Sequence, residues 1–452
     1  MSLTAHETAL IDRLSTLATL SPRGKVCGVT GPVVRVRGLN ANIGRQVDLW
    51  TEGGGAPIPA EVIGLEDETL LLMALDELEG IGVGCEAVAR PGDTMAKLGD
   101  ELLGRIIDGL GRPLDGMPLP PLPHRRSLRG KPPGPMERQR ITEVLHTGVR
   151  AIDTMLTIGQ GQRMGIFAGA GVGKSTLLSM LARHGDFDVC VVSLIGERGR
   201  EVREFVEDAI TDKNRQRTCV VAVTGDQAPL TRIRGALLST TIAEYFSAQG
   251  RNVVLLFDSL TRYAMALREV GLASGEMPAT KGYPPSVFVE LARLLERAGN
   301  YQAGCITGIY TVLVEGDDLA DPVADSTRAL LDGHAVLSRD LAAKGIFPAL
   351  EILDSKSRLM SQITSKEMQN ISRRTISILA AHRQAEDLIR IGAYKPGSDK
   401  EVDIALSFVP RYLTFLAQEQ SEKTDYELAA NGLKKLIDKY GRMSTRGSTS
   451  AK

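Results

Sequence analysis

Residues 164–175 read Met-Gly-Ile-Phe-Ala-Gly-Ala-Gly-Val-Gly-Lys-Ser, an apolar run that passes directly into a glycine-rich loop. A helix-forming stretch follows, so the segment predicts a strand, a loop and a helix in succession. The glycines at 169, 171 and 173 allow backbone conformations that a Cβ would forbid, and successive N–H groups can then converge on phosphates at the helix N-terminus. The stretch therefore predicts a loop that binds the phosphates of a nucleoside triphosphate.

Two polar residues at the end of this loop carry its chemistry. Lys174 is expected to reach the β- and γ-phosphates, and Ser175 to hold Mg²⁺. Ala168 departs from the strict motif, which has glycine there, whereas Gly-Val-Gly-Lys-Ser over 171–175 is intact. The alternative is a glycine-rich turn with an accidental lysine, and the flanking strand and helix argue against it. The residues expected to contact the nucleotide are Gly169, Ala170, Gly171, Val172, Gly173, Lys174, Ser175 and Thr176.

The composition of the 452-residue chain limits its class. Residues are 43% hydrophobic, enough for a large core, and the net charge of −1 provides no global field toward nucleic acid or an acidic membrane. We find no signal-peptide pattern and no apolar segment of transmembrane length, so we expect a cytoplasmic protein. The five widely spaced cysteines are typical of reduced core thiols, and the six scattered histidines predict no transition-metal site.

Changes in pattern divide the chain into five parts. Residues 1–23 have apolar side chains at helical spacing and predict an amphipathic helix, which either packs on its own domain or serves self-assembly or a membrane surface. Short β-like runs with frequent glycine and proline predict a β-barrel over 24–92. Residues 93–365 form the predicted nucleotide-binding domain, 366–440 a helical domain, and 441–452 a Ser/Thr/Gly-rich tail expected to be disordered.

The middle part predicts a parallel sheet. Nearly continuous apolar runs alternate with helical stretches, as in strands that are buried on both faces and covered by helices, so the fold class is α/β. Before these runs, residues 113–135 contain eight prolines and predict an extended strap across the surface. The expected strands are 164–168, 189–195, 220–224, 253–257 and 306–313.

Carboxylates follow two of the expected strands. Asp258 comes directly after the apolar run 253–257, at the sheet edge where open α/β sheets bind ligands, and we expect it to be a second ligand of Mg²⁺, through water. Capping a turn is its alternative role. Glu197 follows the strand 189–195 and can orient and polarise the water that attacks the γ-phosphate. The alternative for Glu197 is a solvated charged turn, but the hinge at Gly196 favours a functional role.

Three further charged residues are weaker candidates. Arg198 can contact the γ-phosphate or orient Glu197, and Glu201 can reach the water shell of the metal. A neighbouring subunit can also supply an arginine finger, a cation that offsets charge developing between the phosphates. Arg358 is the candidate, although spacing alone does not distinguish it from other surface arginines.

Four blocks of sequence resemble the ATPases of type III protein export, which are relatives of the catalytic subunit of rotary ATP synthases. The resemblance runs from Gly24 to about Gln418 and includes 103–116 and 314–318. It implies an N-terminal β-barrel, a central RecA-like P-loop domain with a mostly parallel sheet, and a C-terminal helical domain, assembled as a homohexamer with ATP at the subunit interfaces. The blocks are 165–175, Gly-Glu-Arg-Gly-Arg-Glu-Val at 196–202, Leu-Phe-Asp-Ser-Leu-Thr-Arg-Tyr at 256–263 and Gly-Tyr-Pro-Pro-Ser-Val-Phe at 282–288.

The resemblance also assigns site residues. Glu197 falls on the catalytic glutamate, Arg198 on its phosphate-contacting neighbour, and Arg358 on the finger that reaches the adjacent site. Phe415, in Phe-Leu-Ala-Gln at 415–418, falls near the adenine pocket, with a plain core position as its alternative. The implied cofactors are ATP and Mg²⁺.

The branch within the family depends on two segments. Rotary catalytic subunits have a strongly acidic stretch at the position of 391–399, whereas export ATPases are similar to this chain, and 282–288 agrees. Flagellar and injectisome ATPases differ much less. The length of the chain and the expected N-terminal helix favour the flagellar branch, with a virulence-type injectisome as the alternative.

The family implies an ATPase cycle that unloads chaperones and admits export substrates at the inner face of the cytoplasmic membrane. The implied partners are export chaperones and substrates, regulatory or stator proteins and a central stalk, with the helical domain from 366 as the docking surface.

A ring-shaped nucleic-acid translocase is one rival function, but the barrel of such a protein would need stacking aromatics and a basic groove. Residues 25–90 offer one aromatic, Trp50, and no basic cluster, so no nucleic-acid partner is expected. A non-catalytic scaffold subunit is the second rival, but such subunits replace the carboxylate found here at Glu197.

Overall fold

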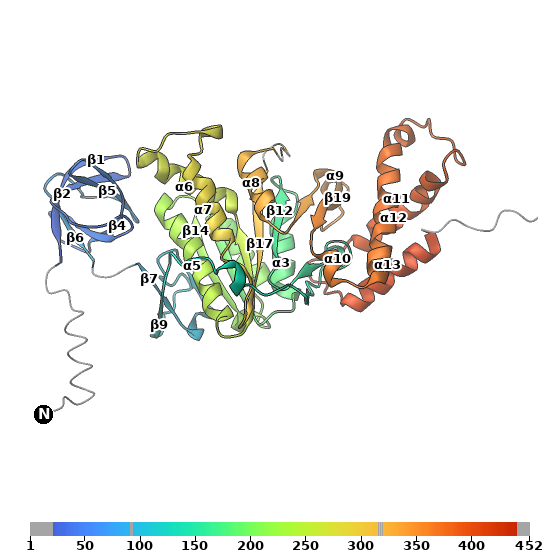
Figure 1. The fold of residues 1–452 in the computed structure, drawn as a ribbon, viewed down its shortest axis with the longest axis horizontal. Coiled ribbons are helices and arrows are strands. Elements are labelled where there is room, and N and C mark those ends of the chain that lie inside the picture. The colour runs from blue at the N-terminus through green and yellow to red at the C-terminus, as the bar shows by residue number, and fades with distance from the viewer. Residues whose placement is uncertain (1–20, 91–93, 315, 317, 319, 441–452) are drawn as a thin grey trace, which may run out of the picture.

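A computed structural model of the chain describes residues 21–90, 94–314, 316, 318 and 320–440. Figure 1 shows a small barrel, a central sheet covered by helices and a helical end arranged in a row. The expected α/β class with an N-terminal barrel and a C-terminal helical part is confirmed. The expected N-terminal helix over 1–23 and the tail over 441–452 lie outside the described residues, apart from 21–23.

Six antiparallel strands close the barrel in the order β1-β2-β5-β4-β3-β6. Side chains alternate between its interior and its outer face, as the period of a strand requires. On β2, for example, Val34 and Val36 are buried in the barrel core whereas Arg37 is exposed. The strands are β1 (Arg23–Thr30), β2 (Val33–Arg37), β3 (Gln46–Trp50), β4 (Ile58–Glu66), β5 (Thr69–Ala74) and β6 (Glu86–Ala89).

The central sheet follows the order β19-β18-β12-β17-β15-β13-β14-β8, with β16 paired to β17. All five expected strands are present as β12, β13, β14, β15 and β17, and they are neighbours in parallel register. The edge strand β19 is antiparallel to β18. The strands are β8 (Ile106–Ile107), β12 (Arg163–Ala168), β13 (Val189–Glu197), β14 (Thr218–Thr224), β15 (Asn252–Asp258), β16 (Gly299–Asn300), β17 (Cys305–Leu313), β18 (Gly333–Leu337) and β19 (Leu350–Ser357).

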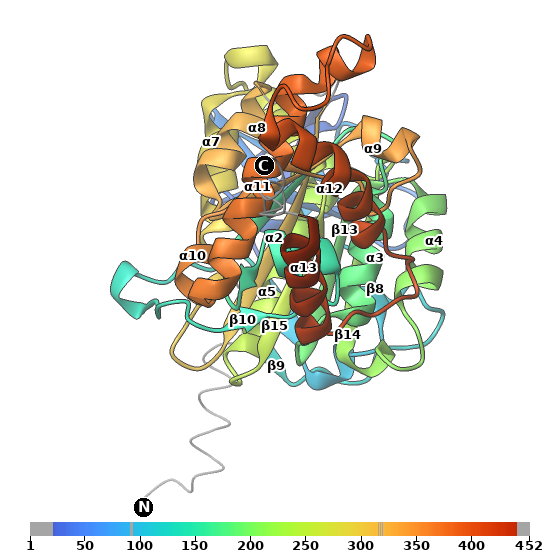
Figure 2. The ribbon, with the colours of Figure 1, turned by 90° about the vertical axis from the view of Figure 1, so that its right-hand side faces the viewer.

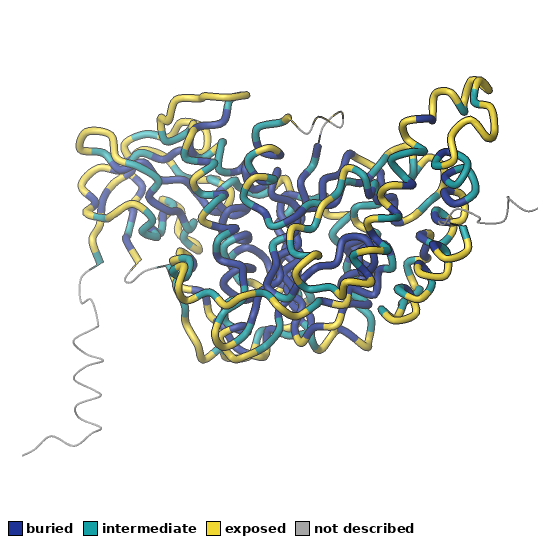
Figure 3. Tube along the Cα trace, turned by 45° about the vertical axis from the view of Figure 1, so that its right-hand side comes forward, coloured by how far each residue is buried: buried dark blue, intermediate teal, exposed yellow. Residues whose placement is uncertain are grey.

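Two hydrophobic cores cover the two faces of this sheet, which is why its strands have continuous apolar runs. Val191 and Leu255 face one core, with α5, α6 and α7. Their neighbours Val192 and Leu256 face the other, with α2 and α3. Figure 3 shows the buried segments, in dark blue, gathered in the centre of the molecule. The helices of this part are α2 (Arg150–Met155), α3 (Lys174–His184), α4 (Gly199–Ala209), α5 (Pro229–Ser247), α6 (Leu260–Ala273), α7 (Pro285–Leu295), α8 (Pro322–Leu330) and α9 (Arg339–Ala343).

Two of the C-terminal helices, α11 and α12, begin at capping side chains that accept hydrogen bonds from the first N–H groups of the helix. The Ser365 Oγ caps α11 by accepting from the Met368 N–H at 3.2 Å, and Asp399 caps α12. Figure 2 shows α13 in front of α2, and these two helices pack together. No helix among the described residues is long and apolar enough to cross a bilayer. The helices are α10 (Met360–Ile363), α11 (Lys366–Arg390), α12 (Lys400–Leu416) and α13 (Tyr426–Tyr440).

Shorter elements join these parts. The proline-rich segment 113–135 is extended and contributes β9, which pairs with β7. Its start is fixed by Arg105, whose guanidinium donates to both oxygens of Asp115 at 2.7 and 2.8 Å. All five cysteines are free and four of them are buried. The short elements are β7 (Met95–Leu98), β9 (His124–Ser127), β10 (Val144–Leu145), β11 (Ile158–Gly159), η1 (Asp100–Leu102), η2 (Pro135–Glu137), η3 (Arg215–Arg217) and η4 (Thr280–Gly282).

Candidate nucleotide-binding site

The glycine-rich loop connects β12 to α3 at the carboxyl edge of the sheet. Gly171 and Gly173 have φ angles of +79° and +89°, in the left-handed region that favours glycine. Gly173 precedes α3, whose first N–H groups receive no side-chain cap and can therefore bind an anion. Ala168 is the last residue of β12 and is buried, so the departure from the strict motif falls in the strand rather than in the cradle.

The other loop residues divide into an anchor and an open side. Val172 is buried in the core beneath the loop, which fixes the loop to the sheet. Ala170 and Ser175 are exposed, and Thr176 is half-buried on the first turn of α3. The Ser175 hydroxyl is thus accessible from outside the loop.

Lys174 extends from the first position of α3 to two carboxylates. Its Nζ lies 2.5 Å from the Asp258 Oδ1 and 3.4 Å from the Glu197 Oε1. Burial of the ammonium opposes its charge, but the two carboxylates outweigh burial and raise the pKa of Lys174. Three sequence-predicted site residues are therefore in contact at the strand ends.

Asp258 is held firmly in this cluster. It ends β15 and is buried, and its Oδ1 also accepts a hydrogen bond of 2.6 Å from the Thr311 hydroxyl. Carboxylate and hydroxyl oxygens are the donors that Mg²⁺ takes in proteins, usually one or two beside phosphates and water. The donor set of Asp258 and Ser175 beside an anion-binding loop fits a magnesium–nucleotide complex.

Glu197 ends β13 directly after a residue that must be glycine. Gly196 has a φ of +76°, and a Cβ there would lie 2.7 Å from the Cβ of Arg262. Burial raises the pKa of Glu197 to about 7, and the negative charge of Asp258 adds to the effect. A carboxyl group with a pKa near neutrality can accept or return a proton readily.

Glu201 and Arg198 lie beside this carboxyl group. Glu201, on α4, shares a hydrogen bond with Glu197; burial opposes ionisation of Glu201, but this bond and a main-chain bond from Arg198 outweigh it and lower its pKa. The Arg198 side chain is 81% exposed, and its Nε lies 3.9 Å from the Glu201 Oε1. Glu201 therefore joins the cluster through Glu197, whereas Arg198 extends from its rim.

Arg358 lies at the amino-terminal edge of the parallel strands, opposite to the carboxyl edge that carries the loop. It follows β19, whose last residue Ser357 pairs with Gly333, and Gly333 pairs with Met164 near the start of β12. The loop begins five residues later, which corresponds to about 16 Å along the strand. The Arg358 side chain is exposed, and its Nη2 lies 3.5 Å from the Arg328 carbonyl. The structure thus does not bring Arg358 to the loop of its own chain.

Phe415 lies near the end of α12 and is half-buried. The Arg150 guanidinium stands over its ring at 5.3 Å from the centroid, and a Cβ on Gly432 would lie 2.8 Å from the ring. Three residues further on, the main chain reaches the loop region, because the Gln418 N–H donates to the Phe347 carbonyl at 2.8 Å. A role of Phe415 near the adenine base stays a prediction.

Sequence reasoning missed two residues at this site. The Phe347 ring lies 3.1 Å from where a Gly173 Cβ would be and is 37% exposed, so an aromatic face is available at the end of the loop. Arg262 covers Gly196, and its buried Nε has no hydrogen-bond partner among the described residues. Both residues are far from the loop in sequence. Only Phe347 offered a local signal, because an aromatic side chain in the turn before β19 is a candidate for stacking on a base.

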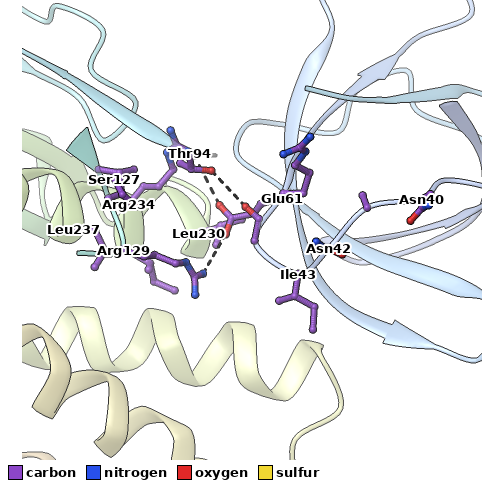
Figure 4. A pocket seen from close by; sticks show the side chains of 15 residues that line it. Asn40, Asn42, Ile43, Glu61, Thr94, Ser127, Arg129, Leu230, Arg234 and Leu237 are labelled. Atoms are coloured by element: carbon purple, nitrogen blue, oxygen red, sulfur yellow. Dashed lines mark hydrogen bonds and ion pairs between the residues drawn. The ribbon is translucent and has the colours of Figure 1, made fainter. Parts of the chain in front are cut away.

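A cavity of about 410 Å³ lies between the barrel and the nucleotide-binding part, away from the phosphate-binding loop (Figure 4). Buried Glu61 of β4 lies there between Arg129 and Arg234, 3.2 and 4.0 Å away. Burial raises the pKa of Glu61 despite these two arginines. None of the sequence-predicted site residues lines this cavity, and the charge cluster ties the barrel to α5.

Models of known families match three segments of the chain. The ATP synthase alpha/beta family, beta-barrel domain, matches residues 26–90, and the nucleotide-binding domain of the same family matches 148–357. The T3SS EscN ATPase C-terminal domain matches 364–435. The three matches follow the order of the three parts of the fold.

Individual relatives match over nearly the whole chain. The flagellum-specific ATP synthases of Treponema pallidum and Bacillus subtilis are 45% and 46% identical, and the matches cover 91% and 92% of this chain and 92% and 95% of theirs. The type 3 secretion system ATPase of Xanthomonas euvesicatoria is 43% identical over 93% of this chain and 95% of its own.

Two solved structures are similar as well. The assembled ATPase EscN from the enteropathogenic E. coli type III secretion system has a TM-score of 0.87 and is 42% identical, covering 92% of this chain and all of that one. The structure of EscN in complex with its central stalk EscO has a TM-score of 0.84, 41% identity and the same coverage. The chain therefore belongs to the family of flagellum-specific ATP synthases and type 3 secretion system ATPases.

Proposed function

We propose that this chain hydrolyses Mg-ATP at the interfaces of a homohexamer and so energises type III protein export, specifically of flagellar components. The observation that carries the proposal is the contact of Lys174 with both Glu197 and Asp258 beside a phosphate-binding loop. The family contributes the assembly, since a relative with 42% identity is described as an assembled ATPase. In this reading 24–92, 93–365 and 366–440 are the three domains of the subunit.

The loop and its two polar residues bind the nucleotide. The N–H groups from Gly169 to Thr176 converge on the phosphates, and Lys174 leaves its carboxylate partners to neutralise the β- and γ-phosphates. Ser175 and Asp258 hold Mg²⁺. When bound, the ion would neutralise charge on the phosphates. Phe347 stacks on the base, and Phe415 supports that pocket from α12.

Glu197 acts on the attacking water. Its pKa near 7 suits a carboxylate that must orient water and take up a proton at neutral pH. Glu201 keeps Glu197 in place through their shared hydrogen bond and faces the water shell of the metal. Arg198, which follows Glu197 in the chain, and Arg262, which packs against Gly196, are the arginines that can contact the γ-phosphate of the same subunit.

Arg358 completes the site of the neighbouring subunit. It lies at the edge of the sheet opposite to its own loop, which supports a role at the site of a neighbouring subunit rather than at its own. An arginine supplied in this way stabilises charge that develops in the transition state and accelerates hydrolysis by roughly 10³–10⁵. Hydrolysis then depends on assembly, and ATP binding closes an interface that product release opens.

The export role rests on the relatives. Flagellum-specific ATP synthases are 41–46% identical to this chain and a type 3 secretion system ATPase is 43% identical, so identity does not separate the two branches, and the flagellar branch is the one that we propose and test below. EscN is described in complex with a central stalk, and we propose that this chain also binds a stalk protein, together with stator proteins, chaperones and export substrates. Its place would be the inner face of the cytoplasmic membrane, at the export gate.

Two substitutions test the enzymatic proposal. Glu197→Gln keeps the size of the side chain but removes the carboxylate, so we expect unchanged binding of Mg-ATP and a fall in hydrolysis of about 10²-fold or more. Glu207→Gln is the matched control, because Glu207 lies on the exposed face of α4 and pairs only with its helix neighbour Arg203 among the described residues. If Glu197→Gln hydrolysed ATP as fast as the parent, its assigned role would be wrong.

The branch is tested genetically. Deleting the gene should abolish motility if the chain serves the flagellum. A strain that remains motile but no longer secretes injectisome proteins would reverse the assignment.

A further inference from the structure

We infer that Gln162 is a positioning residue for Arg358: its buried amide fixes the main chain from which the finger extends to the neighbouring site. The inference rests on the proposed role of Arg358 across the interface. Gln162 lies in the turn between β11 and β12, outside the loop and the carboxylate cluster.

The side chain of Gln162 is fully buried and all its polar atoms have partners. Its Nε2 donates to the Asp332 carbonyl and to the Ser357 hydroxyl, each at 3.2 Å. Its Oε1 accepts from the Gly159 N–H at 2.8 Å. A buried amide with satisfied donors and acceptor has one preferred orientation, because any other leaves polar groups without partners.

The two groups that accept hydrogen bonds from this amide, the Asp332 carbonyl and the Ser357 hydroxyl, also fix the main chain at Arg358. The Arg358 N–H donates to the same Asp332 carbonyl at 3.0 Å. Ser357 is the preceding residue, and its hydroxyl donates onward to the Thr157 carbonyl at 2.8 Å. The peptide before Arg358 is therefore fixed from two sides, whereas the exposed side chain has only the 3.5 Å contact with the Arg328 carbonyl to give up when it reaches a partner.

Asp332 is itself immobilised by the segment that carries Gln162. Its carboxylate accepts from the Arg163 N–H at 3.0 Å and from the Arg163 Nε at 3.1 Å. Arg163 also pairs with Glu296, and the charges of Asp332 and Glu296 more than offset burial and raise its pKa. Two adjacent residues thus hold Asp332: Gln162 donates to its carbonyl and Arg163 donates to its carboxylate. Gln162 directly precedes β12, the strand that leads to the loop, and Arg163 is its first residue.

Accurate placement matters for a finger because a displacement of about 1 Å can cost about 10²-fold in rate. Loss of the amide should therefore lower turnover without weakening the binding of ATP to the same subunit. This pattern separates positioning from a general loss of structure.

The test is a double-mutant cycle in the assembled enzyme, with Gln162→Met, Arg358→Ala and the combination of both. We expect Gln162→Met to lower kcat by about tenfold or more and to change KM for ATP and the Kd of ATP by less than twofold. On the Arg358→Ala background it should lower kcat no further, because the residue through which it acts is already gone.

Equal fold-losses of kcat on both backgrounds, or a parallel rise in KM, would overturn the inference. If Gln162→Met does not fold, Ser357→Ala removes one acceptor of the same amide and should show a smaller loss that also disappears on the Arg358→Ala background. The matched control is Ser239→Ala, which breaks a buried hydrogen bond of 2.7 Å to Ser193 elsewhere in the core and should leave kcat unchanged. If Arg358→Ala alone leaves kcat unchanged, the proposed interface role fails instead.

Discussion

Mixed rings test where Arg358 acts. The sheet register places the main chain at Arg358 about five residues, or about 16 Å along the strand direction, from the loop of the same chain. This distance is beyond the reach of an arginine side chain. A subunit with Glu197→Gln still offers an intact Arg358 to its neighbour, and a subunit with Arg358→Ala still has an intact Glu197. Each variant alone forms rings in which every site lacks one of the two groups.

Random assembly of the two variants in equal amounts restores a defined share of sites. One site in two has an intact Glu197, and one neighbour in two has an intact Arg358, so about a quarter of the interfaces regain both groups. We expect phosphate release at about a quarter of the parent rate if the sites act independently, measured at a concentration where rings form.

A mixture that is no more active than the two separate variants would refute the interface role. Mixing Arg358→Ala subunits with the Glu197→Gln/Arg358→Ala double variant is the control, because no ring in that mixture contains an intact Arg358. It should show no recovery.

Three further predictions concern single residues. Hydrogen bonds from Arg105 lower the pKa of Asp115 to about 2 from 3.8, so the ionised Asp115 stabilises the fold above pH 4 by about 2 kcal/mol, and this contribution is lost as the pH falls from 4 toward 2. The Asp115→Asn variant should therefore have a lower thermal midpoint than the parent at pH 7 but not near pH 2. An equal loss at both pH values would contradict the role of this ion pair. Gly196→Ala should cost about 1–2 kcal/mol from its positive φ alone, with more from the contact with Arg262, and calorimetry that finds no loss of stability would exclude this strain. Phe347→Ala should raise KM for ATP by about three- to tenfold through lost stacking while Phe347→Tyr preserves it; equal KM values for the two variants would argue against a base contact.

Much of the fold was predictable because its signals are local. The five central strands are continuous apolar runs, since helices cover both faces of the sheet, and each was expected within two residues of its observed bounds. The two edge strands β8 and β19, and β18 beside β19, were not predicted. At the edge, only part of each strand is buried, so Glu351 and Lys356 interrupt the apolar pattern on β19.

The sequence by itself determined the phosphate-binding loop and the two carboxylates after β13 and β15. Parallel strands end at one edge, so residues placed at the ends of β13 and β15 lie at the same edge of the sheet as the loop after β12, although β17 separates β12 from β15. Only the tertiary structure decided which distant residues join them. Phe347 and Arg262 reach the site, and Gln162 reaches the root of Arg358, through packing between segments far apart in the chain. Register across β12, β18 and β19 likewise placed Arg358 at the far edge, because the antiparallel edge strand carries its last residue away from the loop.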